Sequence, residues 1–215
     1  GQQTHFIRAL AQVKKASAQA NLHFKKLPEQ TSTAIQKACD ELIQHPEAWQ
    51  SAFPLDPYQG GAGTSINMNA NEVIANIALE MSGHQKGDYH ILHPNDHVNT
   101  SQSTNDVYPT ALRLATYSSL DELLNVLNAL IECIGQKAAE FKYVIKMGRT
   151  QLQDAVPMTM EQEFRAFATL LKEDLKMIRQ MRQLLLEVNL GATAIGTGVN
   201  TPPGYAKRVV ETLAH

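Results

Sequence analysis

The chain of 215 residues is 43% hydrophobic and 19% charged, with a formal net charge of −2. This balance is typical of one or two folded domains with a substantial core, and it excludes an intrinsically disordered chain. The absence of a long basic run, with few aromatic residues, argues against nucleic acid or an anionic membrane as a partner. A small molecule or another protein is the expected partner.

Cysteine content and targeting signals narrow the setting. Cys39 and Cys133 are far apart and have no second Cys or His at ligand spacing, so neither a disulfide framework nor a metal site is predicted. No other cofactor is expected, and a cytoplasmic location fits. No apolar run of membrane-spanning length and no signal peptide is present. The start at Gly1, without Met, suggests a cleavage or cloning boundary, so we expect native residues before it.

Helices are predicted throughout the first part of the chain. Apolar residues recur at helical spacing over about residues 4–24 and 29–44, and proline-containing pairs follow each segment. Residues 53–63 are rich in Gly and Pro and are predicted to form an ordered loop. A third helix is predicted over about residues 67–82, because Gly83 suits the left-handed position that follows a helix.

A long helix follows, ending at about Phe141, and its start is left open. Ser103 and Asp106 resemble a capping box, which favours a start at Ser103. Pro109 would remove an internal hydrogen bond from a helix that began so early, which favours a start at Pro109. Both starts remain possible from the sequence alone.

A second long helix is predicted over about residues 159–188, with Thr159 and Gln162 as its capping pair. Helices of this length need partners to cover their apolar faces. The expected fold class is therefore all-α, with an N-terminal helical domain followed by long helices of a bundle that continues across subunits.

Glycines followed by hydroxyls and amides occupy residues 60–72, at the predicted entry of the third helix. Free backbone N–H groups at a helix start, together with the hydroxyls of Thr64 and Ser65, can hold a carboxylate. The alternative is a tight turn with an ordinary capped helix. Neither a Walker lysine nor the dinucleotide-binding spacing is present, so a phosphate loop is not favoured.

Residues 93–106 form the most polar stretch, with twelve polar side chains among fourteen residues. These amides, hydroxyls and imidazoles can surround a small anion, although Asx turns in an ordered connection would explain them equally well. His93 and His97 are four residues apart, but Pro94 argues against a shared helical face, so no metal site is expected.

Two further segments follow. Arg149, in segment 148–157, is either a salt-bridge partner, with Asp154 as its companion, or a substrate clamp. Residues 191–200 are small enough for close backbone approach and form either a packing turn or a pocket wall. Because these polar segments flank predicted helices, a shared cleft is a reasonable prediction.

Five segments, taken in order, resemble the aspartase/fumarase superfamily over essentially the whole chain. They read GAGTSINMN at 61–69, HPNDHVN at 93–99, QSTND at 102–106, GRTQLQDA at 148–155 and GATAIGTG at 191–198. Within the superfamily, the chain resembles the ammonia-lyase branch at the pairs Thr64-Ser65 and Ser103-Thr104 and at Gln151. Fumarases usually carry two serines in place of Ser103-Thr104. Class II fumarases carry His in place of Gln151, as do some members of the ammonia-lyase branch. His93 before Pro94 is a fumarase-like detail.

The resemblance implies a fold, an assembly and an activity. It implies an N-terminal domain over residues 1–102, the first part of a central long-helix bundle over 103–215, and a homotetramer whose active sites combine three subunits. The implied reaction interconverts L-aspartate with fumarate and ammonia, through abstraction of a β-proton and an aci-carboxylate intermediate. Fumarate hydration and a noncatalytic role in helical assembly are the alternatives.

The resemblance also implies roles for individual residues. Thr64, Ser103 and Thr104 would donate hydrogen bonds to the β-carboxylate, with Ser65 beside them in the substrate site; Asn105, Thr150 and Gln151 would orient the leaving amino group. His93, Asn95 and Asp96 correspond to a possible second dicarboxylate position. The superfamily base is a serine on a mobile loop with no counterpart in this sequence, so no catalytic residue is assigned here and these residues alone are expected to be inactive.

Overall fold

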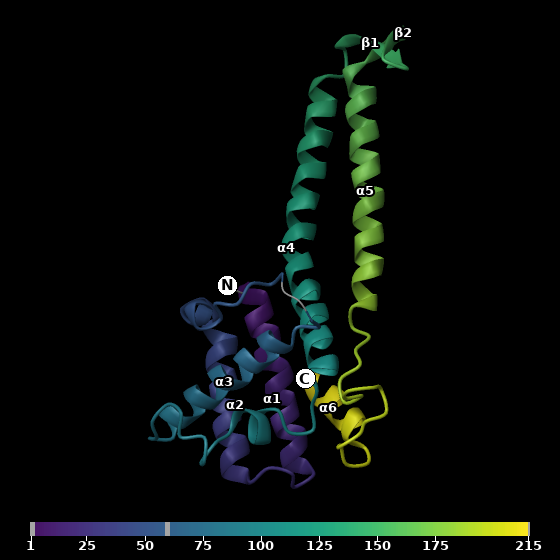
Figure 1. The fold of residues 1–215 in the computed structure, drawn as a ribbon. Helices are drawn as coiled ribbons and strands as arrows, with labels where there is room; N and C mark the ends of the chain where they lie inside the picture. Colours follow the sequence, from purple (N-terminus) through teal and green to yellow (C-terminus); the bar gives the residue numbers. More distant parts are fainter. Residues whose placement is uncertain (1–2, 59–60, 215) are drawn as a thin grey trace. The chain divides into compact units, whose positions relative to one another are not determined.

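The computed structural model describes residues 3–58 and 61–214 (Figure 1). In chain order its elements are α1 (Thr4–His23), α2 (Glu29–Gln44), the 3₁₀ helix η1 (Pro46–Ala52), α3 (Thr64–Met81), the π-helical turn η2 (Pro94–Val98), α4 (Thr104–Glu140), β1 (Ile145–Thr150), β2 (Gln153–Thr159), α5 (Met160–Leu184) and α6 (Tyr205–Leu213). The predicted all-α class is confirmed. One two-stranded hairpin, β1 with β2, and the short helix α6 were not predicted.

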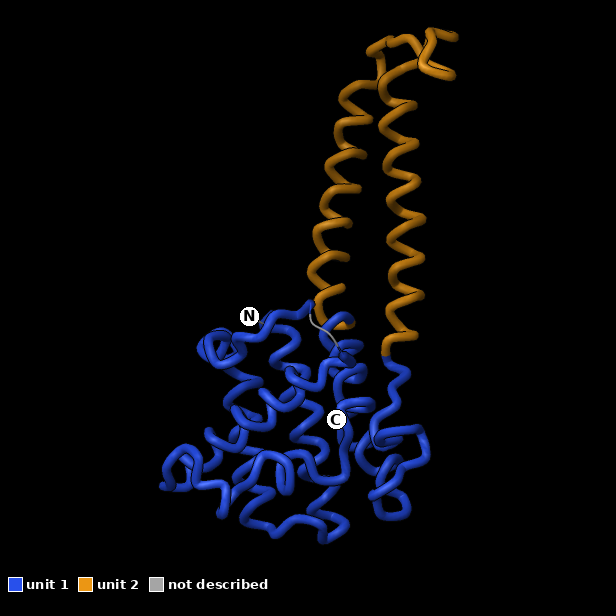
Figure 2. The backbone as a smooth tube through the Cα atoms, in the orientation of Figure 1, with its two compact units in different colours: residues 1–116, 186–215 blue, residues 117–185 orange. Residues whose placement is uncertain are grey.

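The chain divides into two compact units (Figure 2). The first unit comprises residues 1–116 and 186–215, and the second comprises residues 117–185. Helix α4 contributes its first residues to the first unit and the remainder to the second. The predicted boundary between residues 102 and 103 concerns the domains of a complete subunit and stays a prediction.

Helix α1 is the centre of the first unit. Side chains on several of its faces are buried, including Ile7, Leu10 and Val13. It packs against α2, α3, η1 and α6, which explains why so many of its faces are covered. Burial of each such aliphatic side chain stabilises the fold by about 1.5–3 kcal/mol, so this helix anchors the unit.

Helix α3 begins at Thr64, three residues before the predicted start, because the backbone turns at Gly63. Gly63 has a φ of 81° and is the N-cap, and the Tyr108 ring lies where its Cβ would be, at 2.3 Å. Only glycine suits both conditions. Gln59 and Gly60, which belong to the predicted loop before it, lie outside the described residues.

Replacing Gly63 therefore offers a test of this turn. Gly63→Ala is expected to lower the free energy of unfolding by about 1–2 kcal/mol for the left-handed backbone and by about 1–3 kcal/mol more for the contact with Tyr108. Gly83→Ala is the matched control, since Gly83 has a φ of 83° and no other group lies within 4 Å of the place that its Cβ would take. Urea denaturation of both variants measures the difference, and equal losses would contradict a steric role for Tyr108.

The start of α4 is at Thr104, which settles the question that the sequence leaves open. Pro109 lies inside the helix and lacks the N–H that would bond the carbonyl of Asn105. The side-chain amide of Asn189 donates to that carbonyl instead, at 3.1 Å. The helix therefore passes through Pro109 because a distant residue supplies the missing donor.

The second unit pairs the remainder of α4 with α5. Leu124, Ile131 and Leu175 form a small core between them, and the predicted capping box of α5, Thr159 with Gln162, is present. Helix α5 ends at Leu184, four residues before the predicted end. Within the part of the chain that the structure describes, no helix has the length and apolarity needed to cross a membrane.

Candidate functional site

Two of the polar segments meet where α3 and α4 begin. Thr64 and Ser65 lie in the first turn of α3, and Thr104 and Asn105 lie in the first turn of α4. The side-chain amide of Asn67, one turn into α3, donates to the Thr104 hydroxyl at 3.1 Å. This hydrogen bond joins the starts of two helices that are far apart in the sequence.

The Ser103 and Thr104 hydroxyls both accept hydrogen bonds from the protein. Ser103 Oγ accepts from the backbone N–H of Asn105 at 3.2 Å, and Thr104 Oγ1 accepts from Asn67. A hydroxyl has one proton to donate, and the described residues provide no acceptor for either proton. Both side chains are half-buried. Each hydroxyl is therefore free to donate to a ligand.

The start of α3 is also open to an anion. Thr64 and Ser65 are exposed, and no side chain within residues 3–58 and 61–214 caps this end of the helix. The first backbone N–H groups of a helix have no partner inside it and carry partial positive charge. Together with the two hydroxyls, they suit a carboxylate.

The segment around Gly191 packs against the start of α4. The Asp106 carboxylate accepts the backbone N–H groups of Gly191 and Thr193, at 3.0 and 2.9 Å, and that of Ser103 at 3.0 Å. The side-chain amide nitrogen of Asn105 donates to the carbonyl of Ala194 at 2.8 Å. The side-chain oxygen of Asn105 remains as an acceptor. Asp106, completely buried, thus fixes a third polar segment beside the site.

A cavity of about 290 Å³ lies at the edge of this cluster. It is close to the lower end of the size range of small-molecule sites. Its lining residues are Pro57, Gly61, Ala62, Gly63, Asn105, Tyr108 and Pro109. Of the predicted site residues, only Asn105 lines this cavity.

A buried ammonium group lies behind the hydroxyls. Lys14 Nζ donates to Asn99 Oδ1 at 2.9 Å, and Asn67 donates to the same oxygen at 3.3 Å. Burial lowers the pKa of Lys14 to about 7, and the Asp106 carboxylate partly offsets this effect. Lys14 was not among the residues predicted from the sequence. The available signal was its position, since it is in register with Ile7 on the buried stripe of α1.

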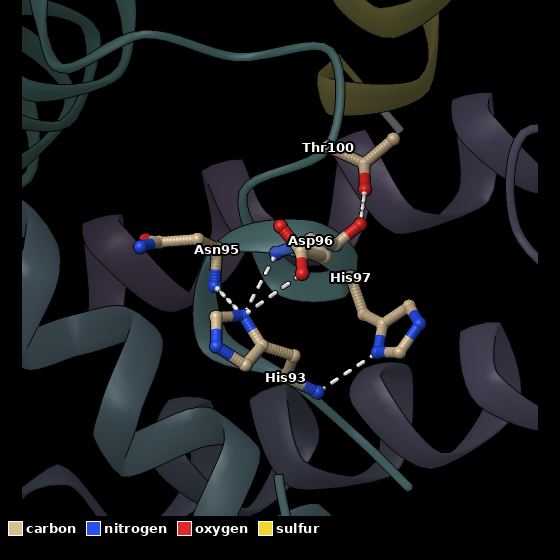
Figure 3. A network of polar contacts seen from close by, with 5 residues as sticks. All are labelled: His93, Asn95, Asp96, His97 and Thr100. Atoms are coloured by element: carbon tan, nitrogen blue, oxygen red, sulfur yellow. Dashed lines mark hydrogen bonds and ion pairs between the residues drawn. The ribbon is translucent and has the colours of Figure 1, made fainter. Parts of the chain in front are cut away.

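The possible second dicarboxylate position forms a compact turn (Figure 3). His93 Nδ1 accepts the backbone N–H groups of Asn95 and Asp96, each at 3.2 Å, and Thr100 donates to the carbonyl of Asp96. The same nitrogen lies 3.5 Å from the Asp96 carboxylate. These contacts explain the Pro94–Val98 turn without a ligand.

The His97 side chain also accepts a backbone hydrogen bond within this turn. Its Nδ1 accepts the backbone N–H of His93 at 2.8 Å (Figure 3). Among the residues that the structure describes, no group of three or more His, Cys, Asp or Glu side chains is placed to hold a metal ion. Cys39 and Cys133 are both free thiols.

Thr150 and Gln151 belong to the second unit, at the tip of the hairpin. Thr150 ends β1, and Gln151 lies in the turn with a φ of 49°. Both are exposed, and Arg149 in the same strand pairs with Asp154 at 3.3 Å. The first unit brings together Thr64, Ser65, Ser103, Thr104 and Asn105, and Thr150 and Gln151 are not part of that cluster.

Comparison with known proteins identifies the family. A family model described as lyase matches residues 2–215. The chain belongs to this lyase family. The resemblance to the aspartase/fumarase superfamily is thereby confirmed, and the relatives and solved structures that are similar to the chain agree with it.

Two curated relatives of this lyase chain are aspartate ammonia-lyases. That of Escherichia coli K12 is 58% identical over 209 residues, which are 97% of this chain and 44% of the relative. That of Bacillus subtilis 168 is 56% identical over 208 residues, 97% of this chain and 43% of the relative. The chain therefore spans less than half the length of these relatives.

Two solved structures have the same fold. A fumarate lyase:delta crystallin from Brucella melitensis superposes with a TM-score of 0.92 at 53% identity, covering 98% of this chain and 45% of the other. A class II fumarase from Schistosoma mansoni gives a TM-score of 0.88 at 36% identity, covering 98% and 44%. The helical lyase fold thus extends to relatives with different names.

Proposed function

We propose that the protein carrying this chain is a lyase that interconverts L-aspartate with fumarate and ammonia. The observation that carries the proposal is the pair of hydroxyls on Ser103 and Thr104, each of which accepts a hydrogen bond and keeps a proton to donate. The names of the relatives at 56–58% identity support aspartate as the substrate.

The proposed chemistry places the β-carboxylate of aspartate against these hydroxyls. Removal of the β-proton moves negative charge onto the carboxylate oxygens and forms an aci-carboxylate. Hydrogen bonds from Thr64, Ser103 and Thr104 would strengthen as this charge develops, and Ser65 would lie beside them. Donors fixed before the reaction stabilise such a transition state without reorganising, and each can contribute about 3 kcal/mol.

The leaving amino group departs as ammonia from its ammonium form, so it needs hydrogen-bond acceptors and no further proton. The free side-chain oxygen of Asn105 would accept from the ammonium, since its amide nitrogen is committed to Ala194. Thr150 and Gln151, in the second unit, are proposed to contact the same group. We propose that they come from neighbouring subunits of a homotetramer, as the resemblance implies.

The base is proposed to be a serine on a Gly- and Ser-rich loop, followed by the Lys and Asn that hold the α-carboxylate. The 215 residues contain no counterpart of this loop. A polypeptide limited to residues 1–215 is therefore expected to release no ammonia from aspartate, as measured with a coupled ammonia assay. Ammonia release by the pure polypeptide would show that the residues present are sufficient for catalysis.

The principal test uses the complete polypeptide that carries these residues. Formation of fumarate is followed by ultraviolet absorbance, with L-aspartate and L-malate supplied in parallel. Turnover of aspartate with no turnover of malate is the expected result. The likeness to the class II fumarase and the His93-Pro94 pair favour fumarate hydratase as the second candidate, which the opposite preference would establish.

A further inference from the structure

Burial of Lys14 in the interior of the first unit is energetically unfavourable. Its side chain is completely buried, and the only hydrogen bond described for its ammonium group goes to Asn99. Removing an ammonium group from water is unfavourable unless other groups compensate. The next residue shows the ordinary alternative, since Lys15 lies near the surface and pairs with Asp40 at 2.5 Å. Packing alone does not explain a lysine at position 14.

The hydrogen bonds that begin at Lys14 have a fixed direction. Lys14 Nζ donates to the Asn99 oxygen: the ammonium form can only donate, and the neutral amine that predominates above a pKa of about 7 keeps two N–H donors for the same contact. The same Asn99 oxygen also accepts a hydrogen bond from the side-chain amide nitrogen of Asn67. That nitrogen donates its second N–H to the Thr104 hydroxyl. Each step sets the orientation of the next side chain. At the end of this chain, Thr104 accepts, and its own proton remains for a ligand.

The orientation of Asn67 is unfavourable by itself. Its side-chain oxygen is buried and has no hydrogen-bond partner among the described residues. If the amide rotated, this oxygen would face Thr104 and accept the hydroxyl proton, which would then be lost to a ligand. Among the residues that the structure describes, the contact with Asn99, which Lys14 orients, is the one that opposes this rotation.

We propose that Lys14 is a positioning residue for the carboxylate site, because it sets the direction of the hydrogen bonds through Asn99 and Asn67 to Thr104. This inference rests on the proposed function and deepens it, since it adds a determinant remote from the substrate. Lys14 touches no reacting atom. It acts by keeping the Thr104 proton available.

A double-mutant cycle in the complete polypeptide tests this role. Lys14→Met removes the donor at similar volume and is expected to lower kcat roughly 10- to 100-fold, less than the loss of a direct donor. In a Thr104→Ala background the same change should alter kcat less than about 2-fold, because residues that act as one unit are non-additive. Equal fold-changes in both backgrounds would overturn the proposal.

Two variants separate positioning from a general effect on the fold. Lys14→Gln keeps an N–H donor and should recover part of kcat, whereas Lys15→Met, on the same helix, should leave kcat unchanged. Melting temperatures are measured for every variant. If Lys14→Met does not fold, Asn99→Leu replaces it in the cycle, with the same non-additivity expected and additivity again contradicting the proposal.

The controls also distinguish the role of Lys14 from the proposed function. Absence of turnover in the unsubstituted complete polypeptide would overturn the proposed function, and the role of Lys14 with it. Normal turnover together with an unchanged kcat in folded Lys14→Met would overturn only the role of Lys14.

Discussion

Thr104→Ala is expected to lower kcat for aspartate by about 100- to 1000-fold in the complete polypeptide. The Thr104 hydroxyl is held by Asn67 at 3.1 Å and keeps a proton that the described residues do not accept. In the proposed reaction this proton meets a carboxylate whose charge grows toward the transition state. The KM for aspartate should change much less than kcat, because the ground-state carboxylate carries less charge than the aci-carboxylate.

Steady-state kinetics with two companion variants test this expectation. Thr104→Ser keeps a hydroxyl and should retain most of the activity. Thr116→Ala is the control on the same helix, since the exposed Thr116 hydroxyl donates to the Leu112 carbonyl away from the site. Analytical gel filtration checks that assembly is unchanged. An unaltered kcat in folded Thr104→Ala would remove this residue from the site.

Helices with local signals were predictable from the sequence. The predicted limits of α1 and α2 match the structure to within a residue, and the Thr159 and Gln162 pair correctly marks the start of α5. Capping pairs and apolar spacing act over a few residues, so they can be read directly. The start of α4 needed more, because the residue that compensates for Pro109 is Asn189, which lies eighty-four residues away from Asn105.

The hairpin shows the opposite case. Its tight turn has Gln151 and Leu152 at φ values of 49° and 65°, where Gly or Asn is usual. Pro157 within β2 also argues against a strand. The usual signals of a hairpin turn are therefore absent at Gln151 and Leu152, and the sequence of this segment indicates a loop between helices.

The candidate site divides in the same way. The residues with hydroxyls and amides lie in recognisable polar segments, so Thr64, Ser103 and Thr104 could be nominated before the structure was known. The residues that orient these hydroxyls from behind could not be predicted. Contacts from Lys14 to Asn99 and from Asn67 to Thr104 join residues that are 85 and 37 positions apart. No local pattern encodes such pairings, although a lysine on an apolar stripe is a usable warning.

Asp106→Asn is expected to cause a large loss of stability, comparable to that of Gly63→Ala. Asp106 is completely buried, and its two carboxylate oxygens accept three backbone N–H groups, from Ser103, Gly191 and Thr193. An asparagine has only one such oxygen, and its NH₂ group would face at least one of these donors. A buried group left without a partner costs about 1–3 kcal/mol, so a total loss of about 3 kcal/mol is expected.

The loss should extend beyond the hydrogen bonds, because the Asp106 carboxylate is also the principal charge that offsets the burial of Lys14. Neutralising it should lower the pKa of Lys14 further. Urea denaturation of the complete polypeptide measures the stability, with Asp121→Asn as control, since the Asp121 side chain on the same helix is exposed and pairs with the half-buried Arg182. That control should cost about 1 kcal/mol or less. Similar losses of stability in both variants would mean that Asp106 does not hold the segment around Gly191 in place. If only Asp106→Asn loses stability, and its kcat also falls, the stability of that segment is linked to the orientation of Ser103.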